Sequence, residues 1–103
     1  MKRRANDTEQ TEDAIADLAV ALAGLRSAEQ VRAFLEDLCT PAELEAMSDR
    51  WRVVPLLNEG VPYREIHDRT QVSVTTIGRV ARVLERGTGG YGAALHRRAA
   101  RHR

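Results

Sequence analysis

The stretch YREIHDRTQVSVTTIGRVARVL, residues 63–84, decides the fold of this chain. Its apolar residues Ile66, Val72, Ile77 and Val80 follow one another at separations of six, five and three. That spacing locks one helix across another at a steep angle, with a short turn between them. With Pro62 at the start of the first helix and a serine cap on the second, the stretch predicts a helix-turn-helix unit over 62–86. We call residues 62–86 the reading head.

The second helix of the reading head has two different faces. At 100° per residue, Ile77, Val80, Ala81 and Leu84 fall within an arc of about 100° and face the core. Gly78, on the opposite face, has two interpretations: close approach to DNA, which we favour, or close packing against a neighbouring helix. A slim basic helix of this kind fits the major groove of DNA. The outer face is small or cationic and has no acid, and it consists of Val74, Thr75, Gly78, Arg79 and Arg82.

Two amphipathic helices are expected in the N-terminal part of the chain. The first starts near Thr11, after a polar and flexible segment 1–10. The second opens at Ser27, which forms a capping-box pattern with Gln30. Two short helices joined by a tight link bury little by themselves, so their apolar stripes need a partner surface. The stripes consist of Ile15, Leu18, Leu22 and Leu25, and of Val31, Phe34, Leu35 and Leu38.

A third helix is predicted to start at Thr40-Pro41-Ala42-Glu43. Thr40 is a suitable cap, and Pro41 suits the first helical position. Pro55 is expected to bend this helix or to divide it, because a proline inside a helix removes a hydrogen bond. Gly60 can end it. Its apolar side, with the tryptophan in the core, is expected to consist of Leu44, Met47, Trp51 and Val54.

The composition indicates an all-α chain. Hydrophobic residues make up 43% of the 103 residues and aromatic residues only 4%, which favours packed helices over a β-sandwich or barrel. We expect one helical domain over 11–86, then a Gly-rich link and a basic tail over 87–103, with a short helix at 91–100. No apolar run is long enough to span a membrane. Cys39 is the only cysteine, so a disulfide within the chain is excluded, and we expect a cytoplasmic protein.

The net charge of +1 hides an asymmetry between the two halves. Residues 1–50 hold 6 basic and 11 acidic residues, and residues 51–103 hold 10 and 4. The C-terminal half is therefore a candidate for a polyanion partner. Arginine, which makes up 15 of the 16 basic residues, suits phosphate and base-edge contacts, although a general bias toward Arg codons is a competing explanation. The Arg-rich tail is either a solvated end or an electrostatic arm on DNA.

Catalysis and metal binding find no support in the residue pattern. No candidate nucleophile has a histidine or an acid nearby in the sequence to activate it. The three histidines lack the spacing of a metal site. We therefore expect no enzyme, no metal and no other cofactor. His67 is interpreted as a plain surface histidine, with a phosphate contact as the alternative.

Several segments resemble a known protein family. TPAELEA at 40–46, Arg50 and the block 63–84 resemble the Trp repressor family. LNEGVPYREI at 57–66 and GTGGYGAAL at 87–95 resemble its YerC/YecD-like branch. The resemblance covers about residues 27–96 and implies a bacterial, all-helical, intertwined homodimer with a helix-turn-helix reading head. Two positions depart from the usual helix-turn-helix pattern: His67 stands where Ala is common, and Gln71 stands where Gly is common.

The resemblance also carries over the positions of a tryptophan pocket. Thr40, Arg50 and Arg79 match pocket residues of the Trp repressor, and the two arginines match the pair that sandwiches the indole. Val80 stands where the repressor has Gly, and would intrude on the ligand. Val83 stands where it has a Ser that holds the ammonium group. A buried ammonium without a partner is costly, so we expect a relic pocket that does not bind tryptophan.

The function that these features imply is a sequence-specific, DNA-binding transcriptional regulator acting as a homodimer on double-stranded DNA. Without tryptophan, Arg50 is expected to pair with Asp49, Glu45 or an acid of the second subunit. One alternative is a protein-interaction module that kept the fold without DNA binding. Another is a repressor gated by a different small effector in the relic pocket. The expected DNA-contacting residues are Tyr63, Arg64, Ser73, Val74, Thr75, Gly78, Arg79 and Arg82.

Overall fold

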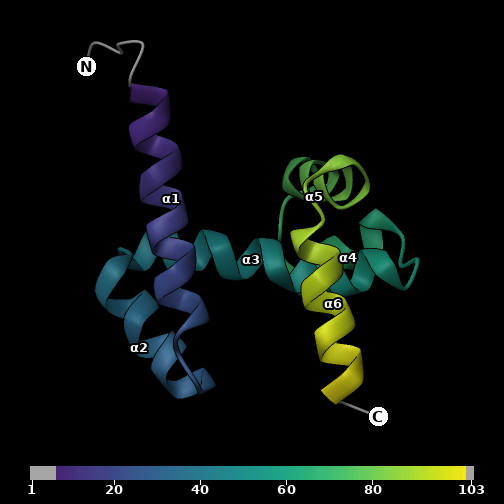
Figure 1. Cartoon of the computed structure of the whole chain (residues 1–103). Helices are drawn as coiled ribbons and strands as arrows, with labels where there is room; N and C mark the ends of the chain where they lie inside the picture. The colour runs from purple at the N-terminus through teal and green to yellow at the C-terminus, as the bar shows by residue number, and fades with distance from the viewer. Residues whose placement is uncertain (1–6, 102–103) are drawn as a thin grey trace. The chain divides into compact units, whose positions relative to one another are not determined.

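The structure, a computed structural model, describes residues 7–101 and consists of helices, with no strand in that range (Figure 1). This confirms the all-α prediction. The helices form two compact units that divide between Thr40 and Pro41. No helix within 7–101 is long and apolar enough to cross a membrane. The helices are α1 (Asp7–Ala23), α2 (Ala28–Leu38), α3 (Pro41–Asn58), α4 (Tyr63–Thr70), α5 (Val74–Arg86) and α6 (Gly90–Arg101).

The N-terminal unit contains α1 and α2. Helix α1 begins at Asp7 rather than near Thr11, so residues 7–10, expected to be flexible, are helical; the rest of that segment lies outside the described residues. Ser27 caps α2 as predicted: its Oγ accepts a hydrogen bond from the Gln30 N–H at 3.1 Å. The Gln30 side chain in turn accepts from the Arg26 N–H at 2.8 Å, so the expected capping box forms with its return bond shifted by one residue.

No side chain among residues 8–40 is buried. On α1, Ile15 is 57% and Val20 72% exposed, whereas Leu22 and Leu25 are partly buried. The first half of the predicted apolar stripe of α1, Ile15 and Leu18, is therefore not covered by other residues of its own unit. This is the burial pattern of helices that need another surface to complete their core.

The C-terminal unit begins with α3, which continues through Pro55 as a single helix. Gly60 then ends it in the left-handed conformation, with φ of +82°. The Gly60 N–H donates to the Leu57 carbonyl, and the Val61 N–H donates to the Leu56 carbonyl, both at 3.0 Å. These two bonds form a Schellman motif, which satisfies the last carbonyls of a helix and favours glycine at the left-handed position. The predicted end of the helix is therefore confirmed.

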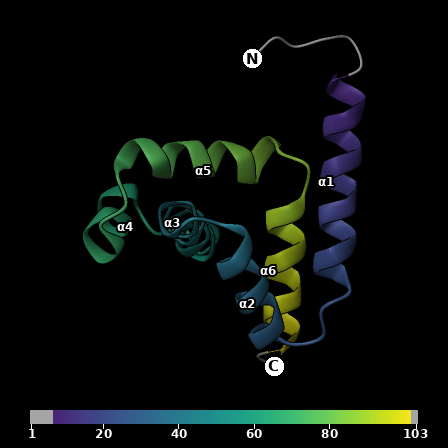
Figure 2. The ribbon, with the colours of Figure 1, turned by 90° about the vertical axis from the view of Figure 1, so that its left-hand side faces the viewer.

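Helices α4 and α5 lie against α3, as Figure 2 shows from the side, and residues of this unit form one hydrophobic core. All four apolar residues whose spacing predicted the reading head are buried. The boundaries of the reading head also agree, because α4 begins directly after Pro62 and α5 ends at Arg86. The core consists of Val53, Val54, Ile66, Val72, Ile77 and Val80.

Trp51 is not in the core, contrary to the prediction. It is 36% exposed, and its ring centroid lies 6.5 Å from that of Tyr91, with the ring planes tilted by 42°. Met47 is exposed as well. The apolar side of α3 extends beyond the part that its own unit covers, because the buried residues of α3 are Val53 and Val54.

Helix α6 lies within the segment predicted as a link and basic tail, and it confirms the short helix expected at 91–100. Tyr91 and Leu95 pack against the core of the C-terminal unit, which anchors the first half of the helix. The chain leaves α5 through a Gly-rich link, and α6 then runs away from α5 (Figures 1 and 2). Its last turns carry Arg97, Arg98 and Arg101, which are exposed.

Candidate nucleic-acid interface

The outer face of α5 is open to solvent. Val74 is 51% exposed, and Thr75, Arg79 and Arg82 are also exposed. This face is opposite to the side of α5 that enters the core through Ile77 and Val80. Because α5 has no acid in its first turn, the positive end of the helix dipole adds to the cationic character of this face.

Four arginines of the reading head make no ion pair within residues 7–101: Arg64, Arg79, Arg82 and Arg86. Arg69 differs from them, because its guanidinium lies 3.2 Å from the carboxylate of Glu65. An unpaired, exposed guanidinium keeps all its donors available for phosphate oxygens or base edges. The reading head therefore presents four such groups to solvent.

Gly78 is not required by packing within the chain. A Cβ atom at this position would meet only the ring of Tyr63, at 4.0 Å from Cε2, which is an ordinary van der Waals distance. An alanine would therefore fit, although glycine inside a helix costs roughly 1 kcal/mol relative to alanine. Close packing against a neighbouring helix of this chain therefore does not explain why position 78 is glycine. Tyr63 itself is 43% exposed and lines the same surface.

Ser73 uses its side chain to begin α5. Its Oγ accepts a hydrogen bond from the Thr76 N–H at 3.1 Å and donates to the Thr76 Oγ1 at 3.0 Å. This is the arrangement that the sequence predicted for a helix cap. The cap fixes where the outer face starts, and a contact between Ser73 and DNA remains a prediction.

His67 is neither a surface residue nor a free phosphate ligand, so the sequence-based interpretation was wrong. Its side chain is partly buried, and Nδ1 lies 2.8 Å from the carbonyl oxygen of Val72. A carbonyl oxygen only accepts, so Nδ1 carries the proton. The sequence contained one signal for this hydrogen bond, the histidine itself. Alanine, the common residue at this position, has no side-chain group that could form a hydrogen bond across the turn.

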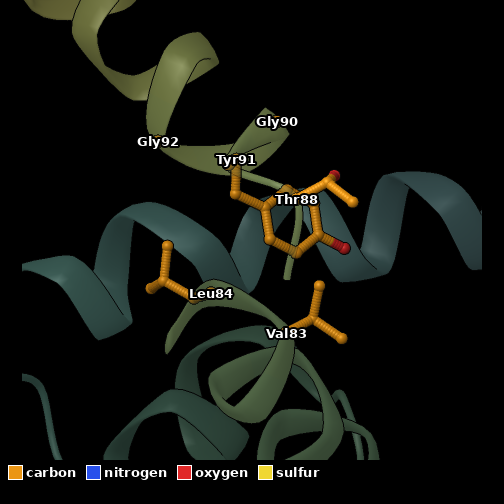
Figure 3. A pocket seen from close by; sticks show the side chains of 7 residues that line it. Val83, Leu84, Thr88, Gly90, Tyr91 and Gly92 are labelled. Carbon is orange, nitrogen blue, oxygen red and sulfur yellow. The ribbon is translucent and has the colours of Figure 1, made fainter. Parts of the chain in front are cut away.

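The residues matched to a tryptophan pocket point in different directions. Val80 is 1% exposed and belongs to the core, whereas Val83 is 42% exposed. Val83 lines a hollow of about 290 Å³ together with Leu84, Thr88 and Tyr91, whose side chains Figure 3 shows around it. The burial of Val80 is explained by packing, and Val83 brings no charged or acceptor group to the hollow.

Arg50 lies on α3 and is partly buried. The expected ion pair with Asp49 or Glu45 is not present within residues 7–101. Asp49 instead lies 4.0 Å from the guanidinium of Arg52. A pair between Arg50 and an acid of a second subunit remains a prediction.

A helical core that presents the second helix of a tight helix-turn-helix, with a basic outer face, defines the class of helix-turn-helix proteins. The family described as "Trp repressor protein" matches residues 13–99. The chain therefore belongs to the Trp repressor family, as its sequence segments indicated.

Individual relatives place the chain near the YerC-like branch of that family. It is 36% identical over 77 residues to "Uncharacterized protein YerC" of Bacillus subtilis, which covers 75% of this chain and 74% of the relative. The crystal structure of a TrpR like protein from Eubacterium eligens superposes with a TM-score of 0.78 at 33% identity, covering 84% of this chain and 90% of the other.

Proposed function

We propose that this protein is a transcriptional regulator that binds double-stranded DNA with α5 in the major groove. The observation that carries the proposal is the outer face of α5, which is exposed, has no acid between Val74 and Arg82, and holds two arginines without ion pairs within residues 7–101. Gly78 supports it, because the helix keeps a glycine where its own chain leaves room for a side chain. A slim helix surface allows close approach to base edges.

The two arginines of this face have different roles in the proposal. Arg79 is nearer to the N-terminus of α5, where a recognition helix reaches base edges. Arg82 lies one turn further along, where the DNA backbone passes. Arg79 therefore contributes to sequence recognition and Arg82 to phosphate binding. Arg64, in the first turn of α4, adds a second phosphate contact.

The regulator acts as a homodimer in this proposal. The N-terminal unit supports this, because none of its side chains from 8 to 40 is buried and α1 exposes Ile15 and Val20. A second copy supplies the missing cover. The two reading heads of the dimer then enter successive major grooves about 34 Å apart. A dimer bound at a promoter changes transcription from that promoter.

Substitution of the two arginines tests the proposal. DNA segments bound in the cell are recovered by genomic footprinting, and affinity for one of them is compared with affinity for a random duplex of equal length over a salt series. Arg82→Ala is expected to weaken binding to both duplexes about equally and to flatten the salt slope by roughly one unit. Arg79→Ala is expected to reduce the preference for the recovered segment, by about 1–3 kcal/mol.

Arg69→Ala is the matched control, because Arg69 is an exposed arginine of the same unit whose guanidinium is held by Glu65. It is expected to leave both affinities unchanged. If Arg79→Ala and Arg82→Ala leave DNA retention unchanged at low salt, the reading head is not used on DNA. The alternative of a protein-interaction module then becomes the better explanation.

Tryptophan does not gate the regulator in this proposal. Val83 stands where an ammonium group would need a hydrogen-bond acceptor, and its side chain has none. Calorimetric titration with L-tryptophan is expected to show only heat of dilution, and binding at tens of micromolar or tighter would contradict this. Val83→Ser is the informative reverse variant, because Val80 is in the core and its removal would leave a cavity.

A further inference from the structure

The turn between α4 and α5 has a conformation that its residues do not favour. Gln71 adopts the left-handed conformation with φ of +65°, and its N–H donates to the His67 carbonyl at 2.7 Å. A residue with a Cβ atom meets steric resistance there, whereas glycine does not. The turn therefore needs other interactions to hold it.

Two side chains of α4 supply those interactions, and both act on the backbone of Val72. The Val72 N–H donates to the Thr70 Oγ1 at 3.1 Å, and the Val72 carbonyl accepts from the His67 Nδ1 at 2.8 Å. Thr70 Oγ1 is itself held, because it donates to the Ile66 carbonyl at 2.7 Å. Both polar groups of the Val72 backbone are thus bonded to side chains of the preceding helix.

Val72 is the last residue before the cap of α5. Its side chain is 5% exposed and belongs to the core, and Ser73 and Val74 follow it directly. A small rotation at Val72 would displace the first turn of α5, which carries Val74 and Thr75 on the outer face. The backbone of Val72 therefore determines where that turn lies relative to α4.

We propose that His67 is a positioning residue of the reading head: its bond to the Val72 carbonyl sets the placement of the first turn of α5 on DNA. This rests on the proposed DNA-binding function. It goes beyond that function, because His67 does not need to touch DNA. Glycine at position 71 would adopt the left-handed conformation without steric resistance. In this chain position 71 is glutamine, and the hydrogen bonds of His67 and Thr70 to Val72 hold the turn instead.

The test uses three variants of the full chain. His67→Leu keeps the bulk of the side chain and removes the donor. His67→Asn keeps an N–H at the same number of bonds from the backbone as Nδ1. His96→Leu is the matched control, because His96 is an exposed histidine on α6 and makes no hydrogen bond within residues 7–101.

Two quantities are measured for each variant. The first is the ratio of the affinities for a footprinted segment and a random duplex. The second is amide hydrogen exchange along the C-terminal unit, together with the midpoint of urea unfolding. The Thr76 and Ile77 amides, which bond to Ser73, report on the first turn of α5. The amides of α3 report on the stability of the whole unit.

The proposal predicts that His67→Leu lowers the affinity ratio about fivefold, which corresponds to the usual net contribution of one hydrogen bond. Exchange at Thr76 and Ile77 accelerates by a similar factor while exchange in α3 does not. His67→Asn recovers most of both effects, and His96→Leu changes neither. Thr70→Val, which removes the other bond to Val72, accelerates the same two amides.

Three results would overturn the proposal. Unchanged ratio and exchange in His67→Leu would remove it outright. Accelerated exchange throughout the unit with a lower urea midpoint would make His67 a general stabilising residue. A lower ratio without faster exchange would assign it a direct DNA contact. If the unaltered chain binds the footprinted segment no better than the random duplex, the proposed function is wrong, and the DNA part of this proposal fails with it. Amide hydrogen exchange at Thr76 and Ile77 then still decides whether His67 holds the turn.

Discussion

The two units of this chain use the same kind of amphipathic helix with different outcomes. In the C-terminal unit, three helices bury six apolar side chains around α3, α4 and α5. In the N-terminal unit, α1 and α2 also have apolar stripes, but no side chain from 8 to 40 is buried. The difference teaches that periodicity determines which face of a helix is apolar, whereas burial depends on how many helices meet there.

The largest expected effect breaks the C-terminal core. Ile77→Ala removes a fully buried side chain and is expected to lower the free energy of unfolding by about 2–5 kcal/mol, through lost burial and the cavity left behind. Urea unfolding followed by circular dichroism measures it. Val74→Ala, on the exposed face of the same helix, is expected to change stability by less than about 0.5 kcal/mol. Equal effects would mean that α5 is not anchored by its inner face.

The next effect concerns the cover of the N-terminal unit. Sedimentation at micromolar concentration is expected to give twice the chain mass of 11.5 kDa. Ile15→Ser is expected to raise the dissociation constant of the dimer at least about tenfold, since burial of an isoleucine contributes about 1.5–3 kcal/mol. Ala16→Ser, its neighbour on the opposite face of α1, is the control. A well-folded monomer of the unaltered chain would refute the second copy as the partner surface.

A smaller effect compares the same cap in both units. Ser73→Ala removes the bond to the Thr76 N–H and is expected to cost about 1 kcal/mol, visible as a lower urea midpoint of the C-terminal unit. Ser27→Ala removes the equivalent bond in α2. If the N-terminal unit gains its core only by association, that variant weakens the dimer as well as the helix, and the loss depends on protein concentration. If the loss of stability in Ser27→Ala does not change with protein concentration, the N-terminal unit does not gain its core by association.

The smallest change in stability gives the sharpest test of the reading head. Gly78→Ala is expected to raise the free energy of unfolding by about 0.5–1 kcal/mol, because the added methyl group has room and alanine favours the helix. DNA affinity is expected to fall in the same variant, since the methyl group lies between the helix and the groove. Thermal unfolding and DNA titration on one preparation measure both. A more stable variant with unchanged affinity would show that Gly78 does not approach DNA.

Local signals were sufficient for the helices and their ends. The serines at 27 and 73 cap α2 and α5, and Gly60 ends α3, because a cap depends on residues within one turn of it. The spacing of Ile66, Val72 and Ile77 was sufficient for the crossing of α4 and α5, because it places apolar side chains on facing sides of both helices. The start of α1 was misjudged, since polar residues 7–10 give a weak boundary signal.

The candidate site was only partly accessible from the sequence. The basic outer face of α5 follows from periodicity alone. The bond from His67 to Val72 does not, because it depends on a turn whose left-handed residue, Gln71, gives little warning of that conformation. The ion pair of Asp49 with Arg52 rather than Arg50 could have been predicted, because residues three apart on a helix are neighbours and adjacent residues do not face each other.

The sequence by itself determined the all-α class, the reading head and the cationic outer face, because each of these depends on residues close together in the chain. Only the tertiary structure decided that Trp51 stays exposed and that Gly78 has room for a methyl group. These outcomes depend on how far α4, α5 and α6 cover their neighbours. Coverage of that kind arises from contacts between residues distant in the sequence, which no local pattern specifies.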